Sequence, residues 1–303
     1  MLNPVAGRGR AARLRGELQR ALAREAESFW RDAAGLGGDT PVVDIVETAA
    51  PGEAQVLARR AADRGALTVV AAGGDGTFGE VASGLAGSRT RLALVPLGTG
   101  NDFAHALGIG RDIASAVHIA FNGRPRRIDL GELRCSAGAR TFLNAAGCGF
   151  DAAVGERVNR GYPFLRGSAV YVAAVLGAIR SLRPVATRVT VDGRTWTGMS
   201  TLSVVSNGPS FGGGMRIAPG AKPDDGVLEV CVVSAAGRFE FVCHFPRVYR
   251  GTHVDHPKVT MLRGQHVTLE GDEPVPMLVD GDLFGSTPAE IRVMPGALEV
   301  LVP

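Results

Sequence analysis

The chain has 303 residues, 45% of them hydrophobic and 21% charged, with a formal net charge of +3. This length fits one large domain or two ordinary ones, and the apolar content is that of a globular protein with a sizeable core. The weak basic excess, without Lys/Arg blocks interleaved with aromatics, argues against a nucleic-acid-binding protein.

The first 125 residues alternate between helical and strand patterns. Leu14, Leu18 and Leu22 are spaced as on one face of a helix. Pro51 suits the first turn of a second helix, and Asp112 suits the N-cap of the last one. The predicted helices are 10–31, 51–65, 77–87, a short one from 101, and 112–123; the predicted strands are 42–47, 66–73 and 91–98. This alternation predicts an α/β fold with a doubly wound parallel sheet.

After Arg126 the pattern changes to short strands, with helices predicted at 166–182 and 238–250. Asp192-Gly193 is a hairpin signal between two of these strands. This region is predicted to be a β-rich sandwich or barrel-like domain. The apolar stretch "SAVYVAAVLGAI" (168–179) is shorter than the roughly 20 residues of a membrane span. It fits a buried or interfacial helix, so no transmembrane segment is expected.

The start of the chain, "MLNPVAGRG", has the pattern of a loop at a strand end, but almost no strand precedes it. The first strand of a doubly wound sheet usually lies near its centre. We therefore expect the natural chain to begin several residues earlier, with an apolar run before Asn3.

The stretch "VVAAGGDGTFGEV" places glycines between an apolar strand and a helix. Glycines allow the backbone to turn tightly and approach a ligand, and the amides at the helix start attract anions. Thr77 adds a hydroxyl donor. Asp75 suits a phosphate site only if a metal ion, a ribose hydroxyl or an arginine intervenes. The alternative is an ordinary strand-turn-helix with an Asx turn.

Two further loops have similar chemistry. "LVPLGTGNDFA" (94–104) repeats the strand-glycine-helix pattern one βα unit later, and "NPVAGRG" precedes both. Such loops should lie side by side at the carboxyl edge of a parallel sheet, where ligands bind. The sequence therefore favours a nucleoside triphosphate site. It contains neither a Walker A loop nor a G-x-G-x-x-G fingerprint here.

These motifs, followed by "RRIDLGEL", "LNAAGCGFDAAV", "KPDDGVLEV" and "LVDGDLFG", closely resemble the diacylglycerol kinase catalytic family in its bacterial form. The resemblance implies a nucleotide-binding α/β domain over 1–128, to which 288–303 returns, and a β-sandwich lipid-substrate domain over 129–287. ATP would bind in the cleft between them. The implied activity is ATP-dependent phosphorylation of a lipid hydroxyl, with diacylglycerol as the expected acceptor and phosphatidic acid as the product.

The resemblance also implies site residues. The expected nucleotide-binding residues are Asn3, Gly7, Thr48, Gly73, Gly74, Asp75, Gly76, Thr77, Glu80, Thr99, Gly100, Asn101 and Asp102. A Mg²⁺ ion is expected at Asp225 with the carbonyls of Lys222 and Val227. A second Mg²⁺, carried in with ATP, is expected near Asp75 and Asp102 or Asp129. Without the resemblance, Asp224-Asp225-Gly226 is simply a turn before a strand.

The general base implied by the resemblance is Asp282, at a position where the family usually has Glu. Gly79 also departs from the family pattern, which has Asn there. Because phosphoryl transfer depends mainly on positioning, the shorter Asp282 could slow the enzyme or indicate another acceptor. Asp280-Gly281-Asp282 is equally a β-turn signal.

Two other functions stay open. One is a kinase for a soluble substrate such as NAD, because "GGDGT" is also similar to NAD kinases and phosphofructokinases. The other is a regulator that binds nucleotide or lipid without turnover, which the changes at Asp282 and Gly79 favour. Tyr162, Phe164 and residues 169–176 are candidates for an acyl-chain wall or for ordinary core. The cysteines lack C-x-x-C spacing, as expected for thiols in a reducing cytoplasm. We expect peripheral membrane association; homodimerisation is left open.

Overall fold

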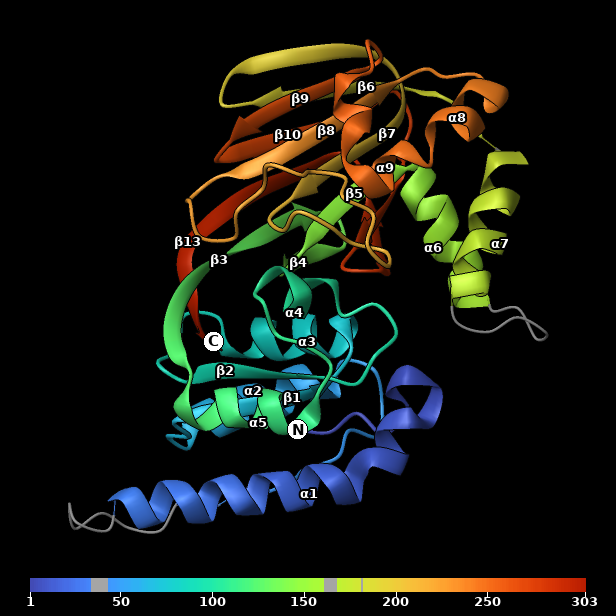
Figure 1. Cartoon of the computed structure of the whole chain (residues 1–303). Coiled ribbons are helices and arrows are strands. Elements are labelled where there is room, and N and C mark those ends of the chain that lie inside the picture. The colour runs from blue at the N-terminus through green and yellow to red at the C-terminus, as the bar shows by residue number, and fades with distance from the viewer. Residues whose placement is uncertain (34–42, 161–167, 181) are drawn as a thin grey trace. The chain divides into compact units, whose positions relative to one another are not determined.

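The structure is a computed structural model of the whole chain, and it describes residues 1–33, 43–160, 168–180 and 182–303 (Figure 1). The chain forms two compact units, here called unit 1 (1–128 and 297–303) and unit 2 (129–296). Strands β3 (Arg124–Cys135) and β13 (Ala289–Val302) each contribute to both units. The chain returns from unit 2 to unit 1 at Ala297, later than residue 288, where the sequence analysis placed this return.

Unit 1 is built on a parallel sheet. Strand β1 (Thr68–Gly73) pairs in parallel with β2 (Arg91–Pro96), and β2 pairs in parallel with the end of β13 through Leu92 and Val300. Both faces of β1 and β2 are covered, which explains why these strands are apolar at nearly every position. The doubly wound α/β prediction is confirmed.

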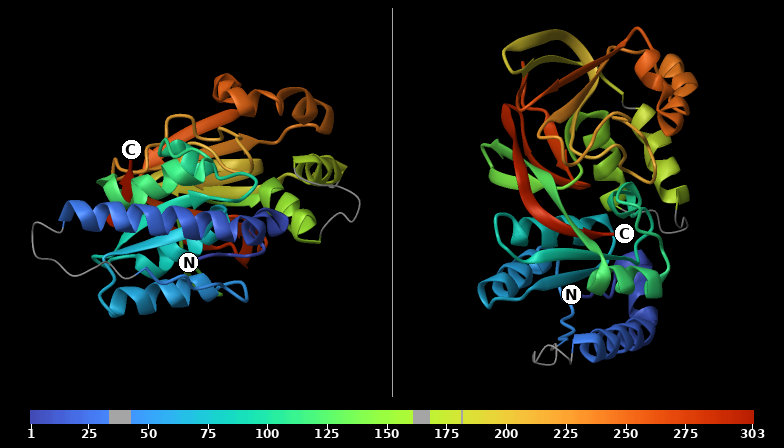
Figure 2. Two further views of the ribbon diagram at one scale, coloured as in Figure 1. Left: turned by 60° about the horizontal axis from the view of Figure 1, so that its bottom comes forward. Right: turned by 60° about the vertical axis from the view of Figure 1, so that its left-hand side comes forward.

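Helices lie on both faces of this sheet (Figure 2). The helix pair α1 and α5 packs together on one face, and the pair α2 and α3 packs together on the other. The helices of unit 1 are α1 (Ala6–Ala33), α2 (Glu53–Asp63), α3 (Asp75–Leu85), α4 (Asp102–Ala106) and α5 (Ile113–Asn122). Asp112 caps α5 as predicted, because its carboxylate accepts a hydrogen bond from the Ser115 amide at 2.8 Å.

Two details of unit 1 differ from the sequence predictions. The strand predicted at 42–47 is wrong for its described part, 43–47, which makes only an isolated bridge between Glu47 and Leu2. Leu2 bridges to Ala72 on its other side, so little backbone is available for 43–47 to pair with. Helix α2 begins after Pro51, because Gly52 adopts a left-handed conformation (φ 82°) at its N-cap.

Unit 2 is an antiparallel β-rich unit in which β13, β10, β6, β7, β5, β11 and β12 pair in that order. The long strand β7 pairs first with β6 and then, from Ser200 onward, with β5 and β8. The strands are β3, β4 (Gly138–Phe142), β5 (Ala145–Gly149), β6 (Val185–Val191), β7 (Arg194–Ser206), β8 (Leu228–Ser234), β9 (Val259–Gly264), β10 (His266–Gly271), β11 (Pro276–Val279), β12 (Asp282–Ser286) and β13. The prediction of a β-rich second domain is confirmed.

Helices cover one side of unit 2. Behind them lies an apolar core cluster that includes Phe150, Leu202, Val204 and Ile217. The helices are α6 (Phe150–Arg160), α7 (Ser168–Arg180), α8 (Arg238–His244), α9 (Arg247–Arg250) and the 3₁₀ helix η2 (Thr252–Asp255). Within the described ranges, no helix combines the length and apolar character needed to cross a membrane.

The predicted hairpin at Asp192-Gly193 is confirmed, since both residues have positive φ angles (46° and 83°) between β6 and β7. Helix α6 and strand β9 were not predicted. The helix predicted at 238–250 is divided at Pro246 into α8 and α9. A proline lacks the backbone N–H that would continue the helical hydrogen bonding, which explains the division.

Candidate functional site

The glycine loops after β1 and β2 touch each other through their backbones. The Leu97 and Gly98 amides donate to the Gly73 carbonyl at 2.7 and 3.0 Å. A Cβ atom on Gly98 would lie 2.5 Å from the Gly74 Cα and 2.7 Å from the Asn101 Oδ1. Only glycine fits such a close approach of two chain segments. The two loops are therefore joined at the carboxyl ends of neighbouring parallel strands, as the sequence predicts.

Asp75 binds the second loop rather than standing free beside it. Its Oδ2 accepts a hydrogen bond from the Asn101 amide at 2.7 Å, and its Oδ1 accepts one from the Phe103 amide at 3.2 Å. These amides lie at the start of α4, where backbone N–H groups lack helical partners. The carboxylate is thus held by backbone dipoles, and no metal ion or arginine is needed to explain it.

Asn101 closes the second loop upon itself. Its Oδ1 accepts from the Gly98 amide and its Nδ2 donates to the Gly98 carbonyl, both at 3.0 Å. The residue is fully buried and has a left-handed backbone conformation (φ 59°), which Asn tolerates better than most residues. Asn101 and Asp75 together fix the loop on which Thr99 and Gly100 lie.

The N-terminal loop joins the same cluster. The Asn3 Nδ2 donates to the Thr77 Oγ1 at 3.0 Å, and the Asn3 Oδ1 accepts from the Val5 amide at 3.1 Å. Gly7 has a positive φ of 58°, and a Cβ atom there would collide with the Leu97 carbonyl. The three glycine-containing segments of unit 1 therefore lie together.

The other predicted nucleotide-binding residues differ in exposure. Gly76 and Thr99 are exposed, Gly74 and Gly100 are half-buried, and Thr48, Thr77 and Asp102 are buried. The Glu80 carboxylate accepts from the Gly52 and Ala54 amides at 2.9 and 3.1 Å, which caps the start of α2. This capping contact gives Glu80 a structural role that the sequence did not reveal.

The predicted general base lies at a hairpin in unit 2. Asp280 and Gly281 have positive φ angles (46° and 94°) and form the turn between β11 and β12, and Asp282 is the first residue of β12. The Asp282 Oδ2 forms an ion pair with the Arg140 Nη2 at 2.6 Å, and its side chain is 57% exposed. Asp282 is therefore an accessible carboxylate oriented by an arginine.

Asp280 has a different role from Asp282. Its carboxylate accepts hydrogen bonds from the Leu143, Asn144 and Ala145 amides at 2.6, 2.9 and 3.0 Å. A carboxylate that accepts several backbone hydrogen bonds anchors the segments that donate them. Asp280 thus fixes the turn that carries Asp282. The sequence contained no signal that separates these two aspartates by role.

In the loop predicted to bind Mg²⁺, both oxygens of the Asp225 carboxylate have partners within the protein. The Asp225 Oδ2 is paired with the Arg263 guanidinium, and its Oδ1 accepts from the Val227 amide at 3.3 Å. Asp129 fixes the same loop, because its two oxygens accept from the Gly226 and Gly296 amides at 2.7 Å each. In the described part of the chain, no group of three or more His, Cys, Asp or Glu side chains could hold a metal ion. The site expected at Lys222, Asp225 and Val227 has only one carboxylate and relies on two backbone carbonyls, so it stays a prediction.

Unit 2 contains an apolar pocket with a volume of about 90 Å³. The residues that line it include Phe150, Leu202, Phe241, Phe245 and Val248. Tyr162 and Phe164, the predicted acyl wall, lie outside the described residues. The helix predicted at 166–182 is described as α7 over Ser168–Arg180, and none of the α7 side chains that the structure describes is among those that line the pocket.

Among the polar side chains that line this pocket, Asp151 and His253 are buried. Burial raises the pKa of the Asp151 carboxyl to about 7. The His253 Nε2 lies 3.1 Å from the Ile217 carbonyl, whereas its Nδ1 is buried without a hydrogen-bond partner among the described residues. Burial lowers the pKa of His253, so a neutral ring that donates from Nε2 is favoured. Sequence reasoning missed both residues, because neither lies in a motif that indicates a pocket.

The fold and the joined glycine loops define an α/β protein of the class that handles phosphate groups at the ends of parallel strands. Residues 1–133 match the diacylglycerol kinase catalytic domain, and residues 144–302 match the YegS C-terminal NAD kinase beta sandwich-like domain. The chain belongs to the diacylglycerol kinase family.

Individual relatives agree with this assignment. A diacylglycerol kinase of Mycobacterium tuberculosis (strain H37Rv) is 33% identical over 266 residues, covering 86% of this chain and 85% of that protein. A diacylglycerol kinase of Bacillus subtilis is 31% identical over 259 residues, covering 84% of each. A crystal structure described as a diacylglycerol kinase from Bacillus anthracis is similar in fold, with a TM-score of 0.72 and 22% identity over 99% of this chain and 94% of that one.

Proposed function

We propose that this protein is an ATP-dependent lipid kinase that transfers the γ-phosphoryl group of ATP to the free hydroxyl of diacylglycerol. The observation that carries this proposal is the set of three glycine-containing segments in unit 1, held together by bonds among Asn3, Gly73, Asp75, Thr77 and Asn101. Relatives that match most of the chain are named diacylglycerol kinases, which supports the choice of acceptor.

In the proposed complex, backbone amides of the glycine loops bind the phosphates of ATP. Gly76 and Thr99 are the exposed members of these loops and would contact the phosphates directly. Asp75 and Asn101 are positioning residues, because their polar atoms are used in holding the loops together. Preorganised donors stabilise the charge that develops during phosphoryl transfer without having to reorganise. ATP would arrive as its magnesium complex, so that Mg²⁺ is part of the substrate.

The proposed chemical step is an in-line displacement. The acceptor hydroxyl oxygen forms a bond to the γ-phosphorus while the bond from that phosphorus to the ADP oxygen breaks. The hydroxyl proton goes to the Asp282 carboxylate, which Arg140 orients. The products are phosphatidic acid and ADP.

The apolar pocket of unit 2 is the proposed binding site for part of an acyl chain. Its volume of about 90 Å³ is smaller than the roughly 150 Å³ of an apolar cavity that admits benzene, so it has room for a short hydrocarbon segment. A longer chain would need its wall to shift. Helix α8 suits such a movement, because none of its residues is fully buried.

The experiment is transfer of label from γ-labelled ATP to diacylglycerol, with the product identified by lipid mass spectrometry. We expect labelled phosphatidic acid. Asp282→Asn should lower kcat at least about 100-fold, because a general base contributes roughly 10²–10⁴-fold. ATP binding by this variant should be unchanged.

The matched control is Asp272→Asn, an exposed carboxylate of the same unit. It should retain full activity. ATP binding without transfer to diacylglycerol or any other lipid alcohol would contradict the kinase proposal. Full activity of Asp282→Asn would contradict only the choice of base.

A further inference from the structure

The segment 238–250 has apolar side chains on two opposite faces. Phe245 and Pro246, which separate α8 from α9, keep helical backbone angles, so the two helices follow one another with little change of direction in the backbone angles. One face forms part of the wall of the apolar pocket, through Phe241, Phe245 and Val248. Phe241 also packs on Phe150 of α6, with ring centroids 4.6 Å apart. This inner face accounts for only three of the eight apolar residues of the segment.

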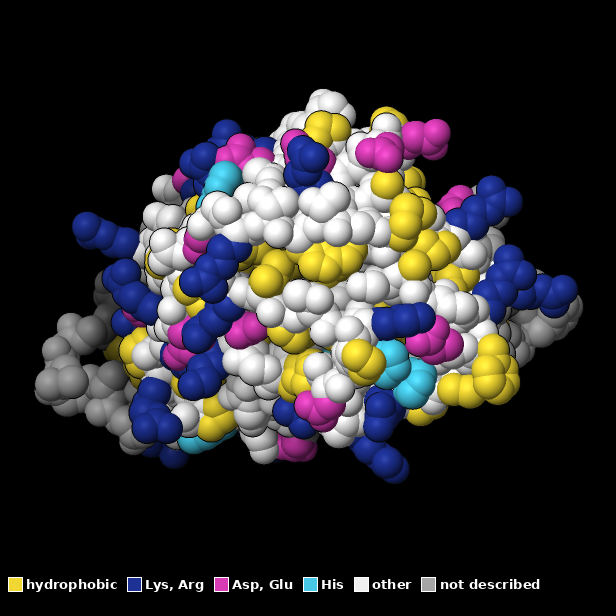
Figure 3. Space-filling model, turned by 90° about the horizontal axis from the view of Figure 1, so that it is seen from above, with side chains coloured by type: hydrophobic (Ala, Val, Ile, Leu, Met, Phe, Trp, Pro, Cys, Tyr) yellow, Lys and Arg dark blue, Asp and Glu magenta, His cyan; other side chains and the backbone are white. Residues whose placement is uncertain are grey.

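The outer face carries Phe239, Val242, Cys243 and Pro246, all exposed. Their spacing of i, i+3, i+4 and i+7 places them in one stripe along the helical segment. Phe239 is 84% exposed and Val242 is 44% exposed, and no residue of α8 is fully buried. Hydrophobic side chains also gather on the right-hand side of the face in Figure 3, the side on which α8 and α9 lie in Figure 1.

Arginines flank this apolar stripe at both ends. Arg238 begins α8, while Arg247 and Arg250 lie in α9, and all three are exposed. Over the part of the chain that the structure describes, no acidic side chain forms an ion pair with any of them. The one acidic residue of the segment, Glu240, is already paired with Lys258 at 2.6 Å.

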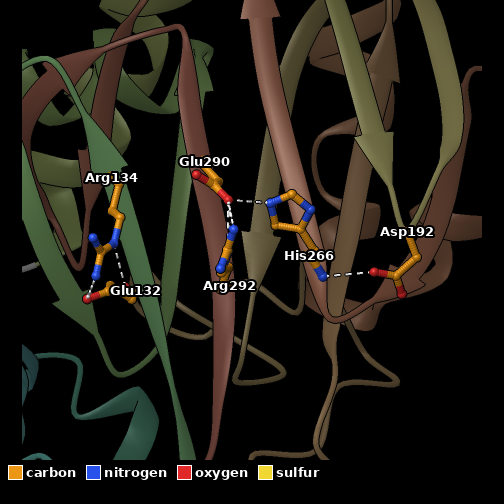
Figure 4. Close-up of polar contacts among 6 residues, drawn as sticks. All are labelled: Glu132, Arg134, Asp192, His266, Glu290 and Arg292. Carbon is orange, nitrogen blue, oxygen red and sulfur yellow. Dashed lines mark hydrogen bonds and ion pairs between the residues drawn. The ribbon is translucent and has the colours of Figure 1, made fainter.

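Charges on the sheet of unit 2 are arranged differently. Glu132 pairs with Arg134 on β3, and Glu290 of β13 pairs with Arg292 and with His266 of β10 (Figure 4). Arg134, His266 and Arg292 thus each have an acidic neighbour, which partly neutralises their charge. The stripe on α8 and α9 instead combines exposed apolar groups with positive charge that is not neutralised.

We propose that the outer face of residues 238–250 docks on the surface of an anionic phospholipid bilayer. Phe239 and Val242 would enter the boundary between headgroups and acyl chains, and the flanking arginines would attract the anionic headgroups. The same segment forms the pocket wall, so docking brings that wall to the membrane from which a lipid acceptor comes. This inference names the membrane partner of the proposed lipid kinase, and in that sense it rests on the proposed function.

The experiment is cosedimentation of the full chain with vesicles of phosphatidylcholine and phosphatidylglycerol in equal parts. Phe239→Asp should weaken vesicle binding at least about tenfold, because it places a charge at the deepest point of the contact. The double substitution Arg247→Glu and Arg250→Glu should weaken it by a similar factor. The effect of the double substitution should disappear at high salt or on phosphatidylcholine vesicles, since attraction to headgroups is screened.

Matched controls lie in unit 1. Leu67 is 83% exposed, so Leu67→Asp repeats the Phe239 change at an equally exposed site, and the double substitution Arg60→Glu and Arg64→Glu repeats the charge reversal. Both controls should bind vesicles like the unsubstituted protein. The docking surface would be refuted if Phe239→Asp bound as tightly as Leu67→Asp. It would also be refuted if the variants dissociated a dimer while vesicle binding stayed the same, because the stripe would then be an interface between copies.

Vesicle binding requires no catalysis, so the two proposals are tested separately. Activity of Phe239→Asp on short-chain diacylglycerol in detergent micelles should equal that of the unsubstituted protein, whereas activity on vesicles should fall together with binding. If micelle activity fell by the same factor as vesicle activity, the stripe would support the structure of the pocket wall and would not contact the bilayer. That result would overturn the docking proposal. Absence of activity on every lipid would overturn the proposed function, and vesicle binding would still decide the docking surface.

Discussion

The candidate sites of the two units are built from different kinds of chemical groups. In unit 1, short polar residues and glycines bond to one another through backbone atoms, as in the contacts of Asp75 with the Asn101 and Phe103 amides. In unit 2, the pocket is lined by bulky apolar side chains from segments far apart in the chain, such as Phe150, Leu202 and Val248. A site built from backbone depends on very few residue types, whereas many combinations of apolar residues can line a pocket. The first kind of site is therefore sensitive to one added methyl group, and the second tolerates change.

The largest effect on nucleotide binding is expected for Gly98→Val. The new Cβ would lie 2.5 Å from the Gly74 Cα, so the two loops must separate. We expect ATP binding, measured by calorimetry, to fall below detection. Gly110→Ala is the control, because a Cβ there meets no atom within 4 Å and its φ is not positive. Normal ATP binding by Gly98→Val would show that contact between the loops is not required.

A smaller effect is expected for Asp75→Ala. This change leaves the Asn101 and Phe103 amides without their acceptor. Loss of a charged hydrogen-bond partner costs about 1–3 kcal/mol in the free energy of unfolding, and a comparable loss in ATP affinity is about tenfold or more. Urea unfolding and calorimetry measure the two quantities. Asp44→Ala, at an exposed site in the same unit, should change neither; an equal loss in Asp44→Ala would contradict a specific role for Asp75.

No effect on ATP binding is expected for Asp151→Asn, which tests the pocket of unit 2 through pH. Burial raises the pKa of Asp151 in the folded protein to about 7, above its ordinary value of about 4. The folded state therefore holds this proton more tightly than the unfolded state, and the contribution of this group to stability falls as pH rises from about 4 to about 7.

Asp151→Asn removes this titration, so the stability of the variant relative to the unsubstituted protein should increase over the same pH range. The size is about 1.4 kcal/mol for each unit of pKa difference. Urea unfolding at pH 5 and pH 8 measures it, with Asp272→Asn as an exposed control. A stability difference independent of pH would mean that Asp151 is not buried as a neutral acid.

Much of the fold follows from local sequence patterns. The apolar runs that became β1 and β2 and the Asp192-Gly193 turn were read correctly, because strand burial and turn geometry are encoded by neighbouring residues. The strand expected at 42–47 was wrong over 43–47, because pairing there depends on Leu2, which is far away in the sequence. Helix α6 was missed for a related reason: it begins directly after β5, with no cap signal between them.

For the candidate site, the sequence by itself determined that glycine-containing loops follow two buried strands, because both patterns are local. The close contacts that require glycine at Gly7 and Gly98 come from the tertiary structure. Only the tertiary structure decided the roles of the carboxylates. Asp75, Glu80 and Asp280 bind backbone amides, Asp282 pairs with Arg140, and Asp151 faces an apolar pocket. A carboxylate takes its role from the donors and charges around it, and folding brings these together from distant parts of the chain.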